Sequence, residues 1–186
     1  MAIWKVIALN PSWILRTARI VLTPMAWGDL RDLQALKADP RVFAIMMGGV
    51  RRPERAAEEL AEDISFWARH GYGMWSARSA ADGAFLGITG LMLRTDRPGN
   101  TAENAIALRF AFWPDVGGRG LAREAAGAAL RFGSDIAGLE RIIAVARESN
   151  FASRTILGGI GMVECDAFVR DGHAMLMYES VRRRRI

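Results

Sequence analysis

Two segments in the first half of the chain carry apolar residues at the spacing of an amphipathic helix. In residues 27–37 they recur every three or four positions and stop at Asp39 and Pro40, which predicts a short helix. Residues 53–69 show the same period over a longer stretch and predict a second helix. The inward stripe of this second helix is expected to consist of Ala56, Leu60, Ile64 and Trp67, with Phe66 near its edge.

Strand-forming residues dominate the middle of the chain. A first strand is predicted over residues 20–23, where β-branched residues predominate and Pro24 ends the run. Turn-like segments that contain glycine separate the strand-forming stretches after the second helix. These stretches predict three consecutive antiparallel strands, over residues 72–78, 84–94 and 105–113.

The last third of the chain alternates helical and strand patterns. It predicts an alanine-rich helix, a short buried strand, a short helix and two further strands, over residues 121–136, 141–146, 151–158, 162–169 and 174–181. The order is therefore a strand meander, then helix, strand, helix and a closing hairpin, which is typical of a mixed α/β fold.

Composition places the chain among globular proteins and excludes several classes of site. The 186 residues favour one domain over residues 1–186, and 51% hydrophobic against 24% charged residues can bury a core. The single cysteine, Cys165, excludes an internal disulfide, and with only His70 and His173 no Cys/His zinc cluster is expected. We expect Cys165 to be a packed thiol, no bound metal, and a reducing, cytoplasmic location.

The surplus of positive charge is concentrated at one end. Of the net charge of +5, the run Arg182–Arg185 supplies four, so the body is nearly neutral. A terminal run is typical of a solvated arm and disfavours a nucleic-acid surface. No run approaches the roughly 18 to 20 apolar residues of a membrane helix, so no membrane partner is expected.

The segment of residues 117–122, GGRGLA, lies between a predicted strand and a predicted helix. Glycines at a helix start let backbone N–H groups approach an anion closely, and Arg119 and Arg123 add positive charge. No Gly-Lys-Ser/Thr closes a Walker loop, and a dinucleotide fingerprint anchored on Gly118 and Gly120 would put Arg123 at its third glycine. The segment predicts another kind of pyrophosphate cradle, with a flexible turn as the alternative.

Five segments in the same order and spacing resemble the GNAT superfamily of N-acetyltransferases. They are ILRTARIVLTPMAWGDLRDL, DPRVFAIMMGG, HGYGMWSARSAADGAFLGITGL, FWPDVGGRGLAREA and GLERIIAVARESNFASRTILGGIGM, and they cover about residues 14–162. The likeness is greatest to the branch that acetylates N-terminal amino groups of ribosomal proteins. It implies a central, mostly antiparallel sheet with a splayed central strand pair and flanking helices.

The resemblance also implies a binding site for acetyl-CoA. The backbone of the strand before the glycine loop would bind pantetheine as an added strand, the loop amides would hold the pyrophosphate, and Asn150 would contact the pantetheine arm. The loop that resembles the acceptor-facing loop of relatives is residues 45–49. The implied CoA-binding residues are Phe110, Ala111, Phe112, Gly117, Gly118, Arg119, Gly120, Leu121, Ala122, Arg123 and Asn150.

At several positions the chain departs from the family pattern. Gly117 replaces a residue that is commonly basic or tryptophan in relatives, which predicts a more mobile loop. Ala107 stands where many relatives have a glutamate that receives the amine proton, and the nearest acid is Glu103. Leu157 falls near the place of a tyrosine that protonates the thiolate, so Ser153, which matches a serine near the thioester sulfur, is the candidate donor.

The function implied is direct transfer of an acetyl group from acetyl-CoA to a primary amine, which is a small molecule or a protein N-terminal α-amine. Two alternatives stay open. Ala107 favours a non-catalytic CoA-binding relative, and the arginine tail favours an RNA or ribosome binder. Both a monomer and a homodimer are compatible with the sequence.

Overall fold

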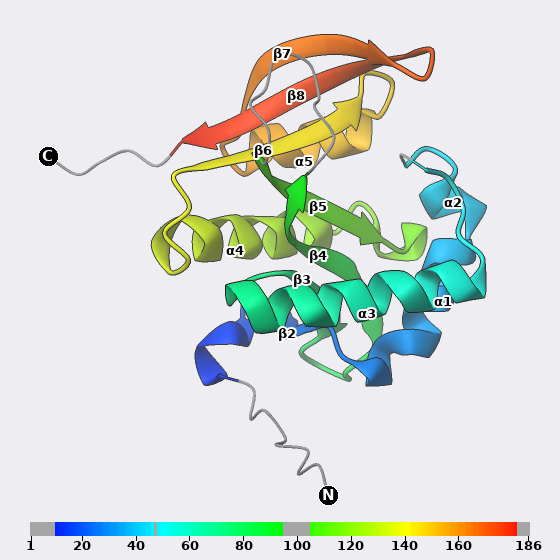
Figure 1. Cartoon of the computed structure of the whole chain (residues 1–186), viewed down its shortest axis with the longest axis vertical. Helices are drawn as coiled ribbons and strands as arrows, with labels where there is room; N and C mark the ends of the chain where they lie inside the picture. Colours follow the sequence, from blue (N-terminus) through cyan, green and yellow to red (C-terminus); the bar gives the residue numbers. More distant parts are fainter. Residues whose placement is uncertain (1–9, 47, 95–104, 182–186) are drawn as a thin grey trace, which may run out of the picture.

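The computed structural model describes residues 10–46, 48–94 and 105–181. These residues form an eight-stranded sheet in the order β1-β2-β3-β4-β5-β6-β8-β7 (Figure 1). The strands are β1 (Leu15–Arg16), β2 (Ile20–Pro24), β3 (Met74–Ser79), β4 (Phe85–Arg94), β5 (Ala105–Phe112), β6 (Arg141–Arg147), β7 (Val163–Arg170) and β8 (His173–Val181). The helices are α1 (Leu30–Ala38), α2 (Pro40–Phe43), α3 (Pro53–His70), α4 (Leu121–Asp135) and α5 (Phe151–Gly159), with short 3-10 turns at Pro11–Trp13, Trp27–Asp29 and Pro114–Val116.

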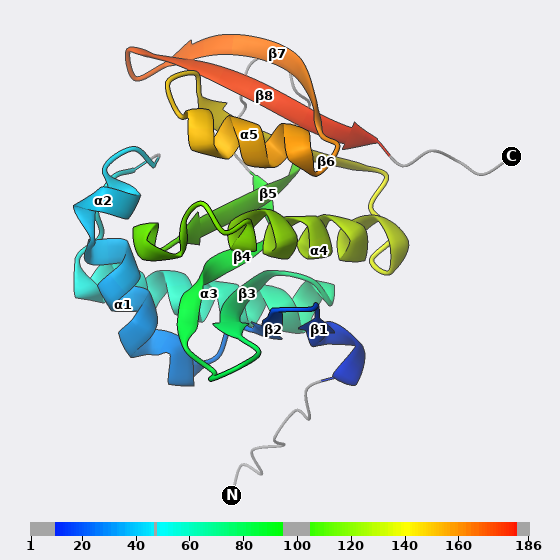
Figure 2. The same cartoon turned by 180° about the vertical axis from the view of Figure 1, so that it is seen from behind.

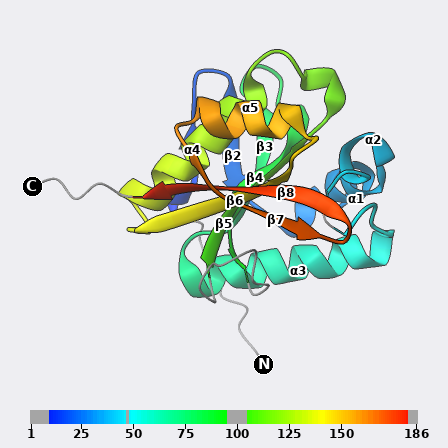
Figure 3. The same ribbon diagram turned by 90° about the horizontal axis from the view of Figure 1, so that it is seen from above.

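The helices cover both faces of the sheet. Figure 3 shows α3 on one side of the strands, and α4 and α5 on the other. Alanines, two leucines and a phenylalanine of α4 pack with residues of β2 to β6 in the larger apolar core. A second core joins α1, α2 and α3 to Met74, Ile88 and Ala111 on the opposite face of the sheet. The predicted mixed α/β class is confirmed.

The two central strands, β5 and β6, run parallel and touch over only a short distance. Ile106 pairs with Ile142 and Ala107 with Ile143, and no later residue of β5 pairs with β6. On their outer sides, β4 remains paired with β5 as far as Phe112, and β8 with β6 as far as Arg147. Each half of the sheet is therefore held from outside while the centre opens, which confirms the splayed pair.

The helices α4 and α5 both begin beyond the carboxyl ends of the splayed strands (Figure 2). They pack against one another, and α4 also contacts strands on both sides of the opening. One face of the split is therefore closed by helices, and a cavity can form only between the strands and toward α3.

Helix α3 begins and ends as its sequence predicts, but its buried stripe differs at one position. Pro53 stands in its first turn, and Gly71 ends the helix with a left-handed φ of 70°. The buried residues are Ala56, Leu60, Asp63, Phe66 and Trp67, while Ile64 is half-buried. Positions 56, 60, 63 and 67 follow the four- and three-residue spacing of one helix face, so an acid occupies a core position.

The other predicted helices and strands are present, with ends within about two residues of those expected.

The prediction that Cys165 is a packed thiol is wrong, because this residue is exposed. Cys165 lies at a register irregularity between Glu164 and Asp166 in β7, the outermost strand, most of whose side chains are exposed. None of the described helices is long and apolar enough to cross a membrane.

The aromatic centre of the larger core gives a direct test of this packing. Trp75 is fully buried, and its ring lies 4.8 Å from that of Trp67 and 5.2 Å from that of Phe132 between ring centroids. Its Nε1 also donates a hydrogen bond of 2.7 Å to the carbonyl oxygen of Trp13. We expect Trp75→Ala to lower the free energy of unfolding by about 3–5 kcal/mol, because it leaves a cavity and an unpaired carbonyl.

Urea unfolding followed by circular dichroism measures this loss. The matched control is Trp27→Ala, because Trp27 is 58% exposed and its removal should change the free energy of unfolding by less than about 0.5 kcal/mol. Equal losses in the two variants would contradict the assignment of Trp75 to the core.

Candidate active site

A cavity of about 480 Å³ lies where β5 and β6 part. This volume is within the range of about 300–1,000 Å³ that is typical of small-molecule sites. Residues 107–111 of β5 and 144–147 of β6 line it from the two strands. The remaining walls come from α1, α2, α3, the loop between α2 and α3, the strands β3 and β4, the first turns of α5 and the hairpin of β7 and β8.

The open stretch of β5 offers unpaired backbone groups to this cavity. Beyond Ala107 the strand pairs with β4 on one side only, and its other edge faces the opening. An extended ligand can hydrogen-bond to such an edge as an added strand would. Of the three predicted pantetheine contacts, Phe110 and Ala111 line the cavity, whereas Phe112 does not and packs against the larger core.

The start of α5 brings two predicted residues into the cavity. Asn150 is the N-cap of the helix, and its Oδ1 accepts a hydrogen bond of 3.0 Å from the backbone N–H of Ser153. Both residues line the cavity, together with Leu157 two turns along the helix. The cap fixes the orientation of Asn150 and directs Ser153 toward the opening between the strands.

The glycine loop lies outside the cavity lining, exposed between the end of β5 and the start of α4. Gly118 and Gly120 have positive φ values of 72° and 73°, and Gly120 is the N-cap of α4. Within the described residues, the backbone N–H groups of Gly118, Arg119 and Gly120 donate to no acceptor. The loop therefore has the free donors and the helix start that an anion site requires.

A brace from the start of the chain holds this loop. Arg19, between β1 and β2, donates from Nη1 to the carbonyl oxygen of Arg119 at 2.8 Å and from Nε to Glu124 at 2.7 Å. Although burial opposes ionisation, hydrogen bonds from Thr17 and Arg19 hold the pKa of Glu124 below its ordinary value. The role of Arg19 could not be predicted from the sequence, because 105 positions separate it from Glu124.

The first loop residue occupies a tight turn. The N–H of Gly117 donates to the carbonyl oxygen of Pro114 at 2.8 Å. A Cβ atom at Gly117 would lie 2.8 Å from the same oxygen, which is closer than real side chains allow. The turn therefore has no room for the larger residue that relatives commonly carry here.

No carboxylate comes from the strand position where relatives have a glutamate. Ala107 lines the cavity with its methyl group, and Glu103 lies outside the described residues. Three acids of α3, Glu59, Glu62 and Asp63, line the cavity instead. Within the part of the chain that the structure describes, the acids of the cavity therefore come from a helix across from β5.

Two of these acids differ sharply in their surroundings. Glu59 lies 2.5 Å from Lys37 and 2.9 Å from Arg51, and although burial opposes it, these hydrogen bonds hold its pKa below the ordinary value. Asp63 is only 8% exposed and makes no hydrogen bond or ion pair with a described residue. Burial raises the pKa of Asp63 to about 7, although the charges of Lys37 and Arg109 oppose the shift.

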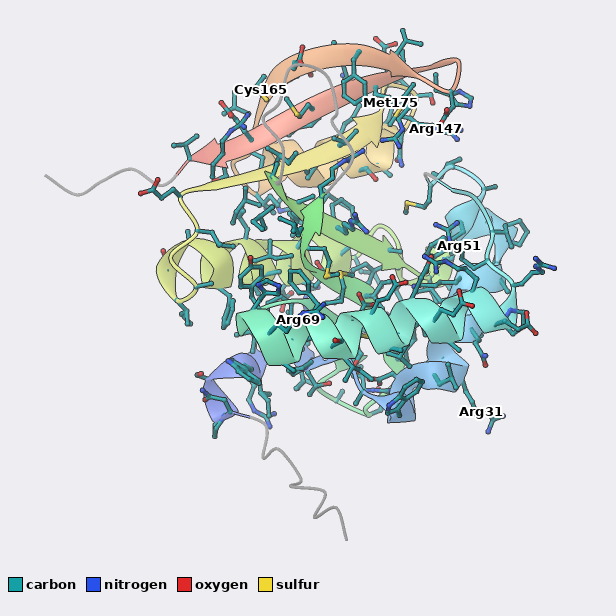
Figure 4. All side chains as sticks on the ribbon, viewed as in Figure 1. Arg31, Arg51, Arg69, Arg147, Cys165 and Met175 are labelled. Carbon is teal, nitrogen blue, oxygen red and sulfur yellow. The ribbon has the colours of Figure 1, made fainter. Side chains whose placement is uncertain are left out.

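Basic side chains outnumber these acids around the cavity. Figure 4 labels Arg51, which precedes α3, and Arg147, at the end of β6, on opposite sides of the opening. Among the described residues, seven basic ones line the cavity against the three acids: Lys37, Arg51, Arg55, Arg94, Arg109, Arg147 and Arg170. The described part of the lining therefore carries a net positive charge.

The resemblance implies that the loop of residues 45–49 faces the acceptor, and part of this loop lines the cavity. Ile45, Met46 and Gly48 line it, whereas Met47 lies outside the described residues. Asp63 was not among the residues predicted from the sequence, whose inward stripe placed Ile64 instead at this part of the helix. The signal that could have placed Asp63 on the buried face is its helical spacing to Leu60 and Trp67.

Among described residues, no group of three or more His, Cys, Asp or Glu side chains could hold a metal ion.

The known proteins described below, to which this chain is similar, are named as acetyltransferases or transacetylases. A relative named FsC-acetyl coenzyme A-N(2)-transacetylase, from Aspergillus fumigatus, is 26% identical over 162 residues, which is 83% of this chain and 66% of the relative. The chain thus spans slightly less than two thirds of that protein's length. A GnaT-family acetyltransferase from Bordetella pertussis has a TM-score of 0.79 and 25% identity, covering 91% of this chain and 99% of that one.

Two enzymes of known acceptor class share the fold at lower identity. RimL, a ribosomal-protein alpha-N acetyltransferase solved with coenzyme A, has a TM-score of 0.72 and 15% identity, covering 91% of this chain and 98% of its own. Spermidine N-acetyltransferase from Vibrio cholerae, solved with CoA and spermine, has a TM-score of 0.73 and 16% identity, with coverage of 89% and 97%. Residues 19–163 match the family described as "Acetyltransferase (GNAT) domain", so this protein belongs to the GNAT family of acetyltransferases.

Proposed function

We propose that this protein transfers the acetyl group of acetyl-CoA directly to a primary amine, with α-amines as the preferred acceptors. The observation that carries the proposal is the parting of β5 and β6. It leaves a strand edge free beside a cavity of about 480 Å³, and the capped start of α5 projects into the same cavity. A thioester and an amine could meet there, away from bulk water.

The arrangement of donors supports acetyl-CoA as the acetyl source. The free edge of β5 near Phe110 and Ala111 suits the extended, amide-bearing pantetheine arm. The free N–H groups of Gly118 to Gly120 and the start of α4 suit a pyrophosphate, with Arg119 and Arg123 adjacent. Because this loop lies outside the cavity, the phosphates would stay exposed while the thioester enters the opening.

The reaction that fits this site needs few protein groups. An uncharged amine attacks the acetyl carbonyl, whose oxygen is stabilised by a backbone N–H, and the thiolate leaves. Holding the two reactants in line can contribute about 7–11 kcal/mol. A single proton donor contributes a factor of about 10²–10⁴, and Ser153 is the group we assign to the thiolate. Positioning between the two strands is therefore the main source of the rate.

The charge of the cavity supports an α-amine over a polycation. An α-amino group has a pKa near 7.7–8.0 and a lysine side chain one near 10.4, so more of the former is uncharged at neutral pH. The seven basic lining residues would repel a polyamine. Peptide N-termini and small α-amino compounds are the acceptors we propose.

The glycine loop is tested by Gly120→Val. A β-branched residue resists the φ of 73° and blocks the close approach of phosphate oxygens to the loop amides. We expect the affinity for acetyl-CoA, measured by calorimetry, to fall about tenfold or more. Gly83→Val is the matched control, because Gly83 has a φ of 75° with open space around it in the β3–β4 turn. An unchanged affinity in Gly120→Val would contradict the assignment of the loop.

Ser153 is tested by Ser153→Ala. Loss of the hydroxyl should lower kcat by about 10- to 10³-fold and leave acetyl-CoA affinity nearly unchanged, because one proton donor is lost without a binding contact. Thr155→Ala is the control, since Thr155 is exposed on the same helix and does not line the cavity. A wild-type kcat in Ser153→Ala would exclude Ser153 as the donor.

The acceptor class is tested with three amines at pH 7. We expect a peptide with a free N-terminus to be acetylated faster than the same peptide with a blocked N-terminus and one lysine, and faster than spermidine. The kcat/KM for the first peptide, which reports the free substrate, should rise with pH as its free amine is populated. Lysine or spermidine outperforming the α-amine would contradict the proposed class. A lack of turnover with all amines, while CoA binds, would favour the non-catalytic alternative.

A further inference from the structure

Asp63 is the unusual acid of the cavity. Asp63 lines the cavity and is 92% buried. Its carboxylate has no hydrogen-bond or ion-pair partner among the described residues. A buried carboxylate without partners costs stability, since the charged form loses its hydration. A structural role would be expected to provide compensating hydrogen bonds, and Asp63 has none.

The position of Asp63 complements a gap in β5. Ala107 and Arg109 lie two residues apart and therefore on the same face of the strand, and both line the cavity. Asp63 of α3 lines the same cavity as these two residues of β5, and the charge of Arg109 acts on its carboxylate. Ala107 contributes no carboxylate to this part of the cavity, whereas Asp63 does.

We propose that Asp63 is the general base of the acetyl transfer and accepts the proton that the attacking amine loses, directly or through one water. This inference rests on the proposed function. It assigns the base to a helix across the cavity, at a position that neither the strand motif nor the comparisons indicate.

The proton transfers balance over one turnover. The amine nitrogen forms the C–N bond to the acetyl carbonyl carbon, and the C–S bond breaks with its electron pair leaving on sulfur. The nitrogen gives one proton to the Asp63 carboxylate. The sulfur takes one proton from the Ser153 hydroxyl, which regains one from water, and Asp63 returns its proton to water. The products are an amide and a free thiol.

The other two acids of α3 are poorer candidates. Glu59 is fully engaged with Lys37 and Arg51, which stabilise its charged form and weaken it as a base. The side chain of Glu62 is 62% exposed and lies 3.3 Å from Arg55. Of the three, only Asp63 combines burial with an unused carboxylate.

The charges around Asp63 come from three elements. Lys37 of α1 and Arg109 of β5 favour its ionised form, while burial, Glu59 and Glu62 of its own helix oppose it. The resulting pKa of about 7 is close to neutral pH, where a general base works best. Asp63 would therefore change its protonation within the working range of the enzyme.

Asp63→Asn tests the assignment because it keeps the shape and removes the base. We expect kcat/KM with the α-amine peptide to fall about 10²–10⁴-fold, with acetyl-CoA affinity unchanged by calorimetry. Glu58→Gln is the matched control, since it removes one acid from an exposed site of α3 outside the cavity and should keep the wild-type rate. Asp63→Glu should restore part of the activity, because it restores a carboxylate.

The pH profile of kcat distinguishes a base from a structural residue. In the wild type, kcat should rise with pH along a limb whose midpoint lies at about pH 7. This midpoint should be the same for acceptors of different amine pKa, because the titrating group belongs to the enzyme. The limb should be absent from Asp63→Asn. A limb of kcat whose midpoint follows the pKa of the amine, or one that persists in Asp63→Asn, would overturn the inference.

Stability gives a readout that does not depend on turnover. The pKa of Asp63 in the folded protein exceeds the 3.8 of the unfolded chain, so between about pH 4 and 7 only the folded state retains the proton. The wild type should therefore lose free energy of unfolding as pH rises through this window, with the full penalty above pH 7. Asp63→Asn lacks this loss, so its stability advantage in urea unfolding should grow from pH 4 to pH 7.

The outcomes separate the two proposals. If the wild type acetylates α-amines and Asp63→Asn does so equally well, the base assignment is overturned and the proposed function stands. If the folded wild type acetylates no amine, both are overturned. A pH-independent stability difference between the two proteins would also overturn the inference, because Asp63 would then not titrate near neutrality.

Discussion

The short parallel contact between β5 and β6 is the constraint on which the molecule depends. Two residue pairs join the halves of the sheet, and a small apolar cluster of Ala107, Ile143 and Met177 packs at this junction. Beyond the junction, the strands separate because each is held by its own antiparallel neighbour. Helix α4 spans both halves on one face and prevents them from separating there. The cavity exists because the same strands are joined at one end and apart at the other.

Helix α3 divides its acids between two tasks. Glu59, one turn before Asp63, gathers Lys37 and Arg51 and so ties α1 and the α2–α3 loop to the cavity wall. Its negative charge is used in holding the walls together. Asp63 receives only the longer-range influence of Lys37 and Arg109. Nearby acids on one helix thus differ in protonation because one has direct cationic partners and the other does not.

Local patterns in the sequence predicted most of the helices and strands, though not β1 and α2, and were not sufficient for the site. The helices and strands followed from apolar spacing, which reflects burial on one face and needs no knowledge of distant residues. The resemblance identified Asn150, Ser153 and the stretch around Phe110 as neighbours of the cavity. The Arg19 brace and the partnerless state of Asp63 could not be read in this way, because they depend on which distant side chains meet after folding. Cys165 was misjudged for the same reason, since an apolar strand at the rim of a sheet has no layer over one face.

The free edge of β5 also bears on self-association. An unpaired strand edge is a template on which a second chain can add, and proteins usually protect such edges. Here the edge faces inward, between β6 and α3, rather than the surroundings of the molecule. A single extended chain with narrow substituents can reach it, whereas the strand of another protein would have to bring its neighbouring strands with it. The same geometry that admits a slender ligand therefore protects this edge of β5 against pairing with a strand of another protein.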